Sequence, residues 1–177
     1  MSDKVNVQKV VPYAESKLSK KEQIADMFNN IAFRYDFLNH FMSLGIDVIW
    51  RKKALKQLKT LQPKQMLDVA TGTGDFAIMA NRLLQPDHIT GIDISEGMLT
   101  VGRKKIEKLG LDNKITLQAG DSETISFPDQ TFDAITVAFG VRNFEHLEKG
   151  LSEMRRVLKP GGKLVILEFS NPTVFPI

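Results

Sequence analysis

Acidic residues and glycines gather in one short stretch of the sequence, residues 65–75, where their spacing could hold a nucleotide-sized ligand. The stretch begins with an apolar run that only Asp68 interrupts, which is the pattern of a strand buried on both faces. A turn containing Gly72 and Gly74 follows, and a helical pattern starts directly after it. Glycines lack Cβ, so backbone N–H groups at the start of a helix can approach a ligand closely. We therefore expect a ligand site where this strand meets the helix.

The charges around this turn discriminate between two ligand classes. The spacing of Gly72, Gly74 and Ala77 also satisfies the loose dinucleotide fingerprint, so the glycines alone do not discriminate between a dinucleotide and another ligand. Asp68 and Asp75 would repel a pyrophosphate but attract a ligand with an ammonium group and a sulfonium centre. The Asp-x-Ala-x-Gly-x-Gly pattern resembles motif I of the class I S-adenosylmethionine (SAM) methyltransferases. The sequence therefore favours SAM over a nicotinamide dinucleotide.

The rest of the chain predicts an α/β fold with a mainly parallel, Rossmann-like sheet. Four further apolar runs have the length of strands: residues 88–93, 115–119, 132–139 and 163–169. Strands separated by helices require right-handed crossovers and a parallel sheet. Ligands of such sheets bind at the carboxyl ends of the strands.

Polar residues follow several of these predicted strands at their carboxyl ends. Asp93 lies about 20 residues beyond the glycines, where α/β nucleotide folds place a carboxylate that binds the ribose hydroxyls. Asp121 and Ser122 follow the third strand, at the level expected for an adenine ring. Arg142 and Asn143 come shortly after the fourth strand. The polar residues at four predicted strand ends should therefore lie together at one edge of the sheet.

The N-terminal part predicts a helical cap over residues 19–62, before a Rossmann-like core in residues 63–177. Residues 1–18 show no period and are expected to be loosely ordered. A capping box at Ser19–Glu22 predicts the start of the first helix. A second helix is predicted to be capped by Asp47 and to run through Leu61. Between them lies an aromatic-rich segment around residues 35–45, expected to line an apolar pocket or to pack as a cap.

Composition limits the other classes of function. Residues 1–64 hold 12 Lys and Arg against 6 Asp and Glu, whereas residues 65–177 hold 12 against 15. The basic front either faces something anionic or is a solvated lysine-rich surface. Because the sequence has no cysteine and its three histidines are scattered, no metal site is expected. A nucleic-acid partner is not expected either. The sequence has no apolar run of membrane-spanning length and no signal core, so a cytoplasmic protein is expected.

From about Gln23 onward the chain resembles the ubiquinone/menaquinone biosynthesis C-methyltransferase family, of the demethylmenaquinone methyltransferase type. The specific segments are Phe-Arg-Tyr-Asp-Phe-Leu-Asn, Met-Ser-Leu-Gly-Ile-Asp-Val-Ile-Trp-Arg and Phe-Gly-Val-Arg-Asn. The resemblance implies SAM-dependent methylation of a ring carbon in a prenylated quinol. By matching positions, it places SAM contacts on Thr73, Asp93, Asp121 and Ser122.

For this chemistry an enolate-like charge must be stabilised while the ring carbon is aligned with the methyl group. Arg142 is expected to stabilise the oxyanion, unless it only forms a structural salt bridge. Asn143 and Tyr35 are expected to orient the hydroxyl group or a bridging water, and His146 to be an exposed loop residue. No general base stands out among three candidates: Asp36, His146 and Glu168.

Two departures from the family accompany this resemblance. The sequence ends at Ile177, just after the fifth predicted strand, where the family continues, so a C-terminal truncation that impairs turnover is expected. Ala138 stands where some relatives have a serine. Two alternatives stay open, namely methylation of another small molecule and a non-catalytic SAM-binding fragment. Peripheral contact with a membrane is expected, as is a homodimer through the edge of the fifth strand or the aromatic-rich segment.

Overall fold

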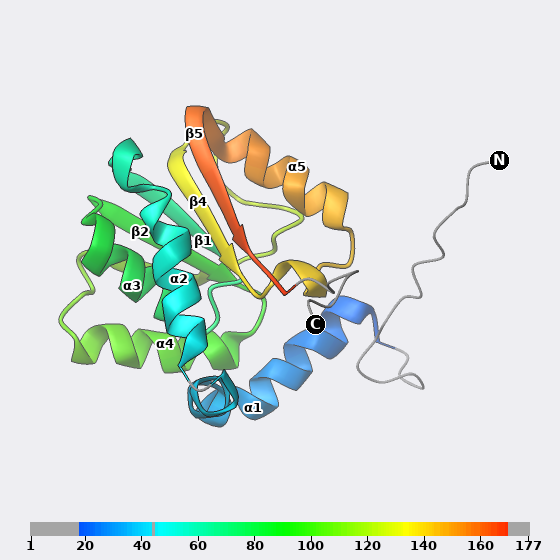
Figure 1. The fold of residues 1–177 in the computed structure, drawn as a ribbon. Coiled ribbons are helices and arrows are strands. Elements are labelled where there is room, and N and C mark those ends of the chain that lie inside the picture. Colours follow the sequence, from blue (N-terminus) through cyan, green and yellow to red (C-terminus); the bar gives the residue numbers. More distant parts are fainter. Residues whose placement is uncertain (1–17, 44, 170–177) are drawn as a thin grey trace, which may run out of the picture.

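Five parallel strands form the centre of the molecule. The computed structural model describes residues 18–43 and 45–169, and of residues 33–43 the backbone alone. The strands are β1 (Gln65–Val69), β2 (His88–Asp93), β3 (Ile115–Ala119), β4 (Phe132–Ala138) and β5 (Leu158–Leu167). Their order is β3-β2-β1-β4-β5, and every pairing is parallel (Figure 1). The predicted Rossmann-like sheet is confirmed.

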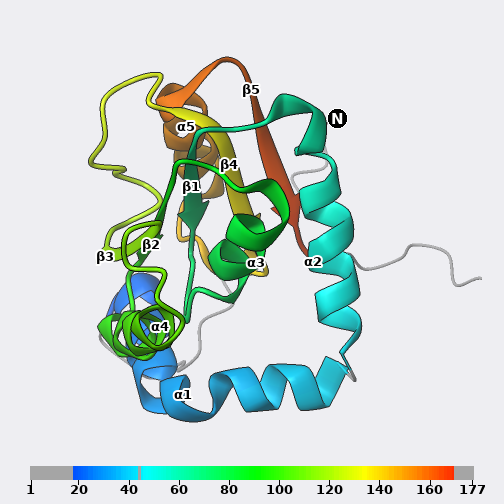
Figure 2. The same ribbon diagram turned by 90° about the vertical axis from the view of Figure 1, so that its left-hand side faces the viewer.

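Helices cover both faces of this sheet (Figures 1 and 2). The helices are α1 (Lys20–Ser43), α2 (Ile46–Lys56), α3 (Asp75–Leu84), α4 (Glu96–Lys108) and α5 (Leu147–Val157), with short 3-10 turns η1 (Lys59–Leu61) and η2 (Val141–Asn143). Buried side chains of α2, α3 and α4 join one core cluster, and those of α5 join the other. None of the helices in the described part of the chain is long and apolar enough to cross a bilayer.

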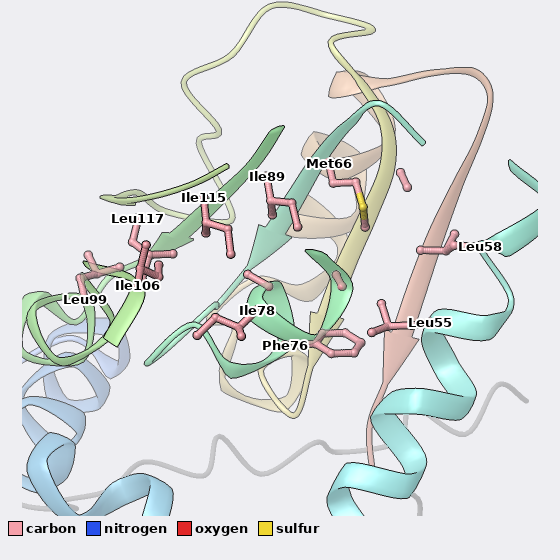
Figure 3. Packing of buried hydrophobic residues seen from close by; sticks show 13 residues of the cluster. Leu55, Leu58, Met66, Phe76, Ile78, Ile89, Leu99, Ile106, Ile115 and Leu117 are labelled. Atoms are coloured by element: carbon pink, nitrogen blue, oxygen red, sulfur yellow. The ribbon is translucent and has the colours of Figure 1, made fainter. Parts of the chain in front are cut away.

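Alternate residues of the buried strands supply the two cores. Met66 of β1 packs with Leu55 of α2, with Leu58 just after that helix and with Phe76 of α3 (Figure 3). Leu67, its neighbour in sequence, points to the opposite face and packs with the cluster that α5 covers. A fully buried leucine contributes about 1.5–3 kcal/mol. Both faces of β1 are therefore apolar, and the buried Asp68 within it requires a separate explanation.

The chain reverses direction across the sheet between β1 and β4. From β1 it proceeds to β2 and β3 on one side, and it then returns to β4 and β5 on the other. In such folds the ligand crevice lies outside the carboxyl ends of the two strands at the reversal. α1 lies beyond these carboxyl ends (Figure 1). The topology therefore places the ligand site between the sheet edge and α1.

Four details of the sequence-based prediction were wrong. Asp47 does not cap α2, because the N-cap is Gly45 in a left-handed conformation and Asp47 is buried inside the first turn. The helix ends at Lys56, and residues 59–61 form the separate turn η1. Residues 120–131 join β3 to β4 without a helix. β5 begins at Leu158 rather than at residue 163, because Leu158 already pairs with Phe132 across an irregularity in the register.

Candidate active site

The glycine turn after β1 has a conformation that other residues would adopt only under strain. Gly72 and Gly74 have φ angles of 57° and 78°, in the left-handed region, and Gly74 is the N-cap of α3. The backbone N–H of Gly72 donates a hydrogen bond of 2.8 Å to Asp93 Oδ2. This bond joins the turn to the end of β2, so two strand ends fix the loop that faces the ligand.

Asp68 is a buried carboxylate held by two hydroxyl groups. Thr71 and Thr136 each donate a hydrogen bond of 2.6 Å to it from Oγ1. Burial raises the pKa of Asp68 to about 6, although these hydrogen bonds and the positive charge of Arg51 act in the opposite direction. A cationic ligand near Asp68 would stabilise its ionised form.

Asp93 also combines burial with backbone hydrogen bonds. Its second oxygen accepts a hydrogen bond of 2.9 Å from the Ser95 N–H, at the point where α4 is about to begin. Burial raises the pKa of Asp93, against the effect of the bonds from Ser95 and Gly72. The Ser95 hydroxyl caps α4 by accepting a bond from the Met98 N–H. Asp93 thus has a fixed position at the edge of the sheet.

Two adjoining cavities occupy the carboxyl edge. The larger encloses about 660 Å³, part of it open to solvent, and its lining includes Gly72, Asp93, Asp121, Ser122 and Asn143. The smaller, of about 400 Å³, is lined by residues of α2, the glycine turn and the end of β4: Arg51, Asp68, Ala70, Thr71, Gly72, Thr73, Asp75, Phe76, Ala138 and Phe139. Four of these residues line both cavities: Ala70, Gly72, Ala138 and Phe139. A concave site at the carboxyl edge of a parallel sheet suits a small-molecule ligand.

Helix α1 forms a roof over the larger cavity. Ile24 and Phe28 line the cavity, and Lys21 Nζ lies 2.6 Å from Asp121 Oδ2. Asn29 Oδ1 accepts hydrogen bonds of 2.8 Å from the Ser95 hydroxyl and from the Gly97 N–H. The predicted capping box starts this helix, since the Ser19 N–H donates to the Glu22 carboxylate and the Glu22 N–H to the Ser19 hydroxyl. The roof therefore attaches to the ends of β2 and β3.

Glu123, which no sequence pattern predicted as a site residue, is buried beside the larger cavity. One oxygen of Glu123 accepts hydrogen bonds from the N–H groups of Glu145 and His146, at 3.1 and 2.9 Å. Burial raises the pKa of Glu123, but its bonds from His146 and the charge of Lys21 outweigh this, and the pKa is lowered overall. Glu123 holds the segment that follows Asn143. No motif marks this role.

The residues predicted for catalysis lie at different depths. Asn143 lines the larger cavity. Arg142 does not line it; its guanidinium forms a 2.8 Å ion pair with Glu168 and lies 5.4 Å from the ring of Phe169. His146 is mostly exposed, as expected, with its Nδ1 2.9 Å from Glu123 Oε2. The side chains of Tyr35 and Asp36 lie outside the described residues.

The cofactor-site predictions fall on both cavities. Asp93, Asp121 and Ser122 line the larger cavity, whereas Asp68 and Thr73 line the smaller. Gly72 lines both cavities, and Gly74 lies on neither lining. Thr73 is buried, and Lys105 donates a hydrogen bond of 3.2 Å to its hydroxyl. The structure thus brings most of the predicted residues to one edge.

The donors and acceptors of this edge fit SAM. Carboxylates at the ends of β2 and β3 suit a nucleoside, which carries ribose hydroxyls and an adenine amino group. The buried Asp68 suits the positive charge of the other half. When bound, SAM supplies an electrophilic methyl group on a sulfonium. Within the described ranges, no group of three or more His, Cys, Asp and Glu side chains could hold a metal ion.

This strand order, with acidic groups at the carboxyl edge, defines a Rossmann-like, SAM-dependent methyltransferase. A solved SAM-dependent methyltransferase from Aquifex aeolicus has the same fold, with a TM-score of 0.61, 30% identity and coverage of 71% of this chain and 68% of that one. The profile of the ubiE/COQ5 methyltransferase family matches residues 16–177, and the chain belongs to that family. It is therefore an enzyme whose cofactor is SAM.

Two curated relatives illustrate the family. The demethylmenaquinone methyltransferase of Bacteroides fragilis is 58% identical over 170 residues, which are 96% of this chain and 69% of that protein. The ubiquinone/menaquinone biosynthesis C-methyltransferase UbiE of Geobacter sulfurreducens is 51% identical over 154 residues, which are 86% of this chain and 60% of that protein.

Proposed function

We propose that this enzyme transfers the methyl group of SAM to a ring carbon of a prenylated quinol, converting a demethylmenaquinol to a menaquinol. The observation that carries the proposal is the 58% identity, across 96% of the chain, to a relative named demethylmenaquinone methyltransferase. The neutral, apolar acceptor is also compatible with the groups beside the cofactor site, which are largely aromatic.

Three aromatic rings support an apolar acceptor next to the cofactor. Phe139 lines both cavities, and its ring stacks on Phe169 with centroids 4.8 Å apart. Trp50 of α2 meets Phe169 edge to face at 5.8 Å. Phe139 has a φ angle of 58°, a strained conformation for a residue other than glycine, and such strain concentrates at functional sites. A flat aromatic ring could stack against this surface.

The polar groups for the reaction would come from the segment after β4. In the proposal, Arg142 stabilises the negative charge that develops when the quinol hydroxyl is deprotonated. Arg142 and its partner Glu168 are partly exposed, so exchanging that ion pair for a contact with the substrate is inexpensive. Asn143 and Tyr35 orient the hydroxyl or a bridging water. The proton acceptor stays open among Asp36, His146 and Glu168.

A prenylated substrate resides in a membrane, and we include peripheral membrane contact in the proposal. Helix α2 exposes Ile46, Ile49 and Trp50. The same helix carries the exposed Lys52 and Lys53, which would favour anionic lipid headgroups. Pairing of two copies along β5 is included as well, because β5 has one neighbouring strand within the described ranges.

The proposal is tested by incubating the purified protein, in a version that also carries the C-terminal part present in its relatives, with SAM carrying a labelled methyl group and a short-chain demethylmenaquinol. Mass spectrometry should find the label on the quinone ring, at a carbon rather than an oxygen. A matched reaction with a quinol already methylated at that carbon should stay unlabelled. If the protein binds SAM but labels neither the demethylmenaquinol nor a demethylated ubiquinol precursor, the proposed substrate class is wrong.

A further inference from the structure

Arg51 is a buried cation whose surroundings do not satisfy it. It projects from α2, and only 7% of the residue is exposed. Among the described residues, its nearest carboxylate oxygens, from Asp75 and Asp47, are 3.7 and 3.8 Å away, beyond hydrogen-bond distance, and its Nε has no hydrogen-bond partner there. Burying a guanidinium N–H without a partner is unfavourable. A ligand with acceptor oxygens would compensate for that loss.

The position of Arg51 indicates which part of a ligand it would meet. It lines the smaller cavity together with Asp68 and Asp75, whereas Asp93 lines the larger one. The two cavities share Gly72 and the end of β4. A ligand whose nucleoside occupies the larger cavity would therefore extend its other end into the smaller one, toward Arg51.

The charges in the smaller cavity match an amino acid. Asp68 and Asp75 supply negative charge for an ammonium group. Arg51 is the cationic side chain in the cavity's lining, as far as the described residues extend. Lys105 lies nearby, but its Nζ is engaged by Asp75 at 2.6 Å and by the Thr73 hydroxyl at 3.2 Å. We propose that Arg51 binds the α-carboxylate of the methionyl part of SAM and thereby selects cofactors that carry a complete amino acid.

The chemistry of arginine suits this role. A guanidinium presents its N–H donors in a planar fork that can bind both oxygens of a carboxylate, whereas a lysine ammonium acts as a point charge. The proposal depends on SAM being the cofactor and is independent of the methyl acceptor, so it would hold for any substrate.

The test is a calorimetric comparison of three ligands. These are SAM, its decarboxylated analogue, which keeps the sulfonium and the amine, and 5′-methylthioadenosine, which keeps the nucleoside only. The wild-type protein should bind SAM about 10- to 100-fold more tightly than the decarboxylated analogue. In Arg51→Met this ratio should fall to about one, while the Kd for 5′-methylthioadenosine changes by less than about threefold. Arg51→Lys, which keeps the charge but not the fork, should retain part of the preference.

A matched control is Lys56→Met, which removes an exposed cation of the same helix and should leave the ratio unchanged. The wild-type protein alone tests the proposal even if Arg51→Met does not fold. If the wild type binds SAM and the decarboxylated analogue equally well, the proposal is wrong. An equal loss for all three ligands in a folded Arg51→Met would also overturn it, since the residue would then be structural. Failure of 5′-methylthioadenosine and SAM to bind the wild-type protein would instead contradict the cofactor assignment.

Discussion

The two halves of the carboxyl edge are built differently. On the side of β1 and β2, Asp68 and Asp93 are held by buried hydroxyl and backbone donors. On the side of β4 and β5, Arg142 is held by one partly exposed ion pair, and Phe169 is 59% exposed. The half proposed to bind the cofactor (the cofactor half) is thus held by buried groups, whereas the half proposed to bind the methyl acceptor (the acceptor half) has more exposed groups that can still move.

This difference indicates how free energy is distributed in the enzyme. Preorganised groups lose little entropy when the ligand binds, but they must be kept in place by folding. Mutations in the cofactor half should therefore change stability and affinity together. Mutations in the acceptor half should change turnover with little effect on either.

The largest effect is expected for Asp68, through folding stability. Its pKa is raised from 3.8 to about 6, so its unfavourable contribution is absent below about pH 4, grows as the pH rises toward 6 and is complete above 6. The shift corresponds to about 3 kcal/mol. Asp68→Asn should raise the free energy of unfolding by up to that amount at pH 7.5, change it little at pH 4, and weaken SAM binding. Urea unfolding at both pH values measures this, and an equal change at both would contradict the cause.

Substitution of Arg142 should change turnover and leave stability and SAM affinity unchanged. Arg142→Ala should lower kcat by about 10²-fold, the usual loss of one oxyanion donor, with an unchanged Kd for SAM and an unchanged free energy of unfolding. Arg155→Ala, which removes an exposed arginine of α5, is the matched control and should leave kcat unchanged. A normal kcat with a weaker Kd for SAM would move Arg142 to the cofactor half.

The main effect of substituting Asp93 should be a weaker affinity for SAM. Asp93→Ala should weaken SAM binding by about 1.5–3 kcal/mol, the range for hydrogen bonds to a charged group, and should also lower the unfolding temperature by leaving two N–H groups without their acceptor. Asp93→Asn can still accept one of these bonds. Its affinity for SAM and its unfolding temperature should therefore lie between those of the wild type and of Asp93→Ala. Calorimetry that finds unchanged affinity in folded Asp93→Ala would exclude the ribose assignment.

The smallest effect is expected at Asn29, where the roof attaches to the start of α4. Asn29→Ala removes an acceptor for two hydrogen bonds at an exposed position, so SAM binding should weaken by about 1 kcal/mol. Asn30→Ala, the neighbouring exposed asparagine, is the control and should behave like the wild type. If the two variants have the same Kd, the attachment of α1 does not contribute to the site.

The sequence predicted the parts of the molecule that depend on local pattern. The strands β2 and β3 have the predicted bounds and α3 begins directly after the glycine turn as predicted, because apolar runs of the right length end at clear breaks such as Gln85–Asp87. Asp93 was located by its distance along the chain from the glycines. Both predictions use regularities that a parallel sheet imposes on neighbouring segments.

Residues whose role depends on distant contacts could not be predicted. Asn29 meets Ser95, 66 positions away, and Glu123 meets the backbone of His146, 23 positions away. Each is a common polar residue with no motif around it. Asp47 was predicted to be a cap because acids often begin helices; in the fold, however, it is buried near Arg51. Tertiary packing decided these positions.

The roof also bears on the timing of catalysis. α1 is held over the nucleoside cavity by the Lys21–Asp121 ion pair and by Lys20, whose Nζ donates a 3.0 Å hydrogen bond to the Phe144 carbonyl oxygen. A demethylated cofactor that leaves past α1 must await the release of these contacts, and such motions often limit turnover. Because salt screens partly exposed charges, we expect stopped-flow measurements to show faster departure of the spent cofactor as ionic strength rises. Two lysines near the N-terminus, Lys20 and Lys21, would then determine how long the demethylated cofactor stays bound rather than how tightly it binds.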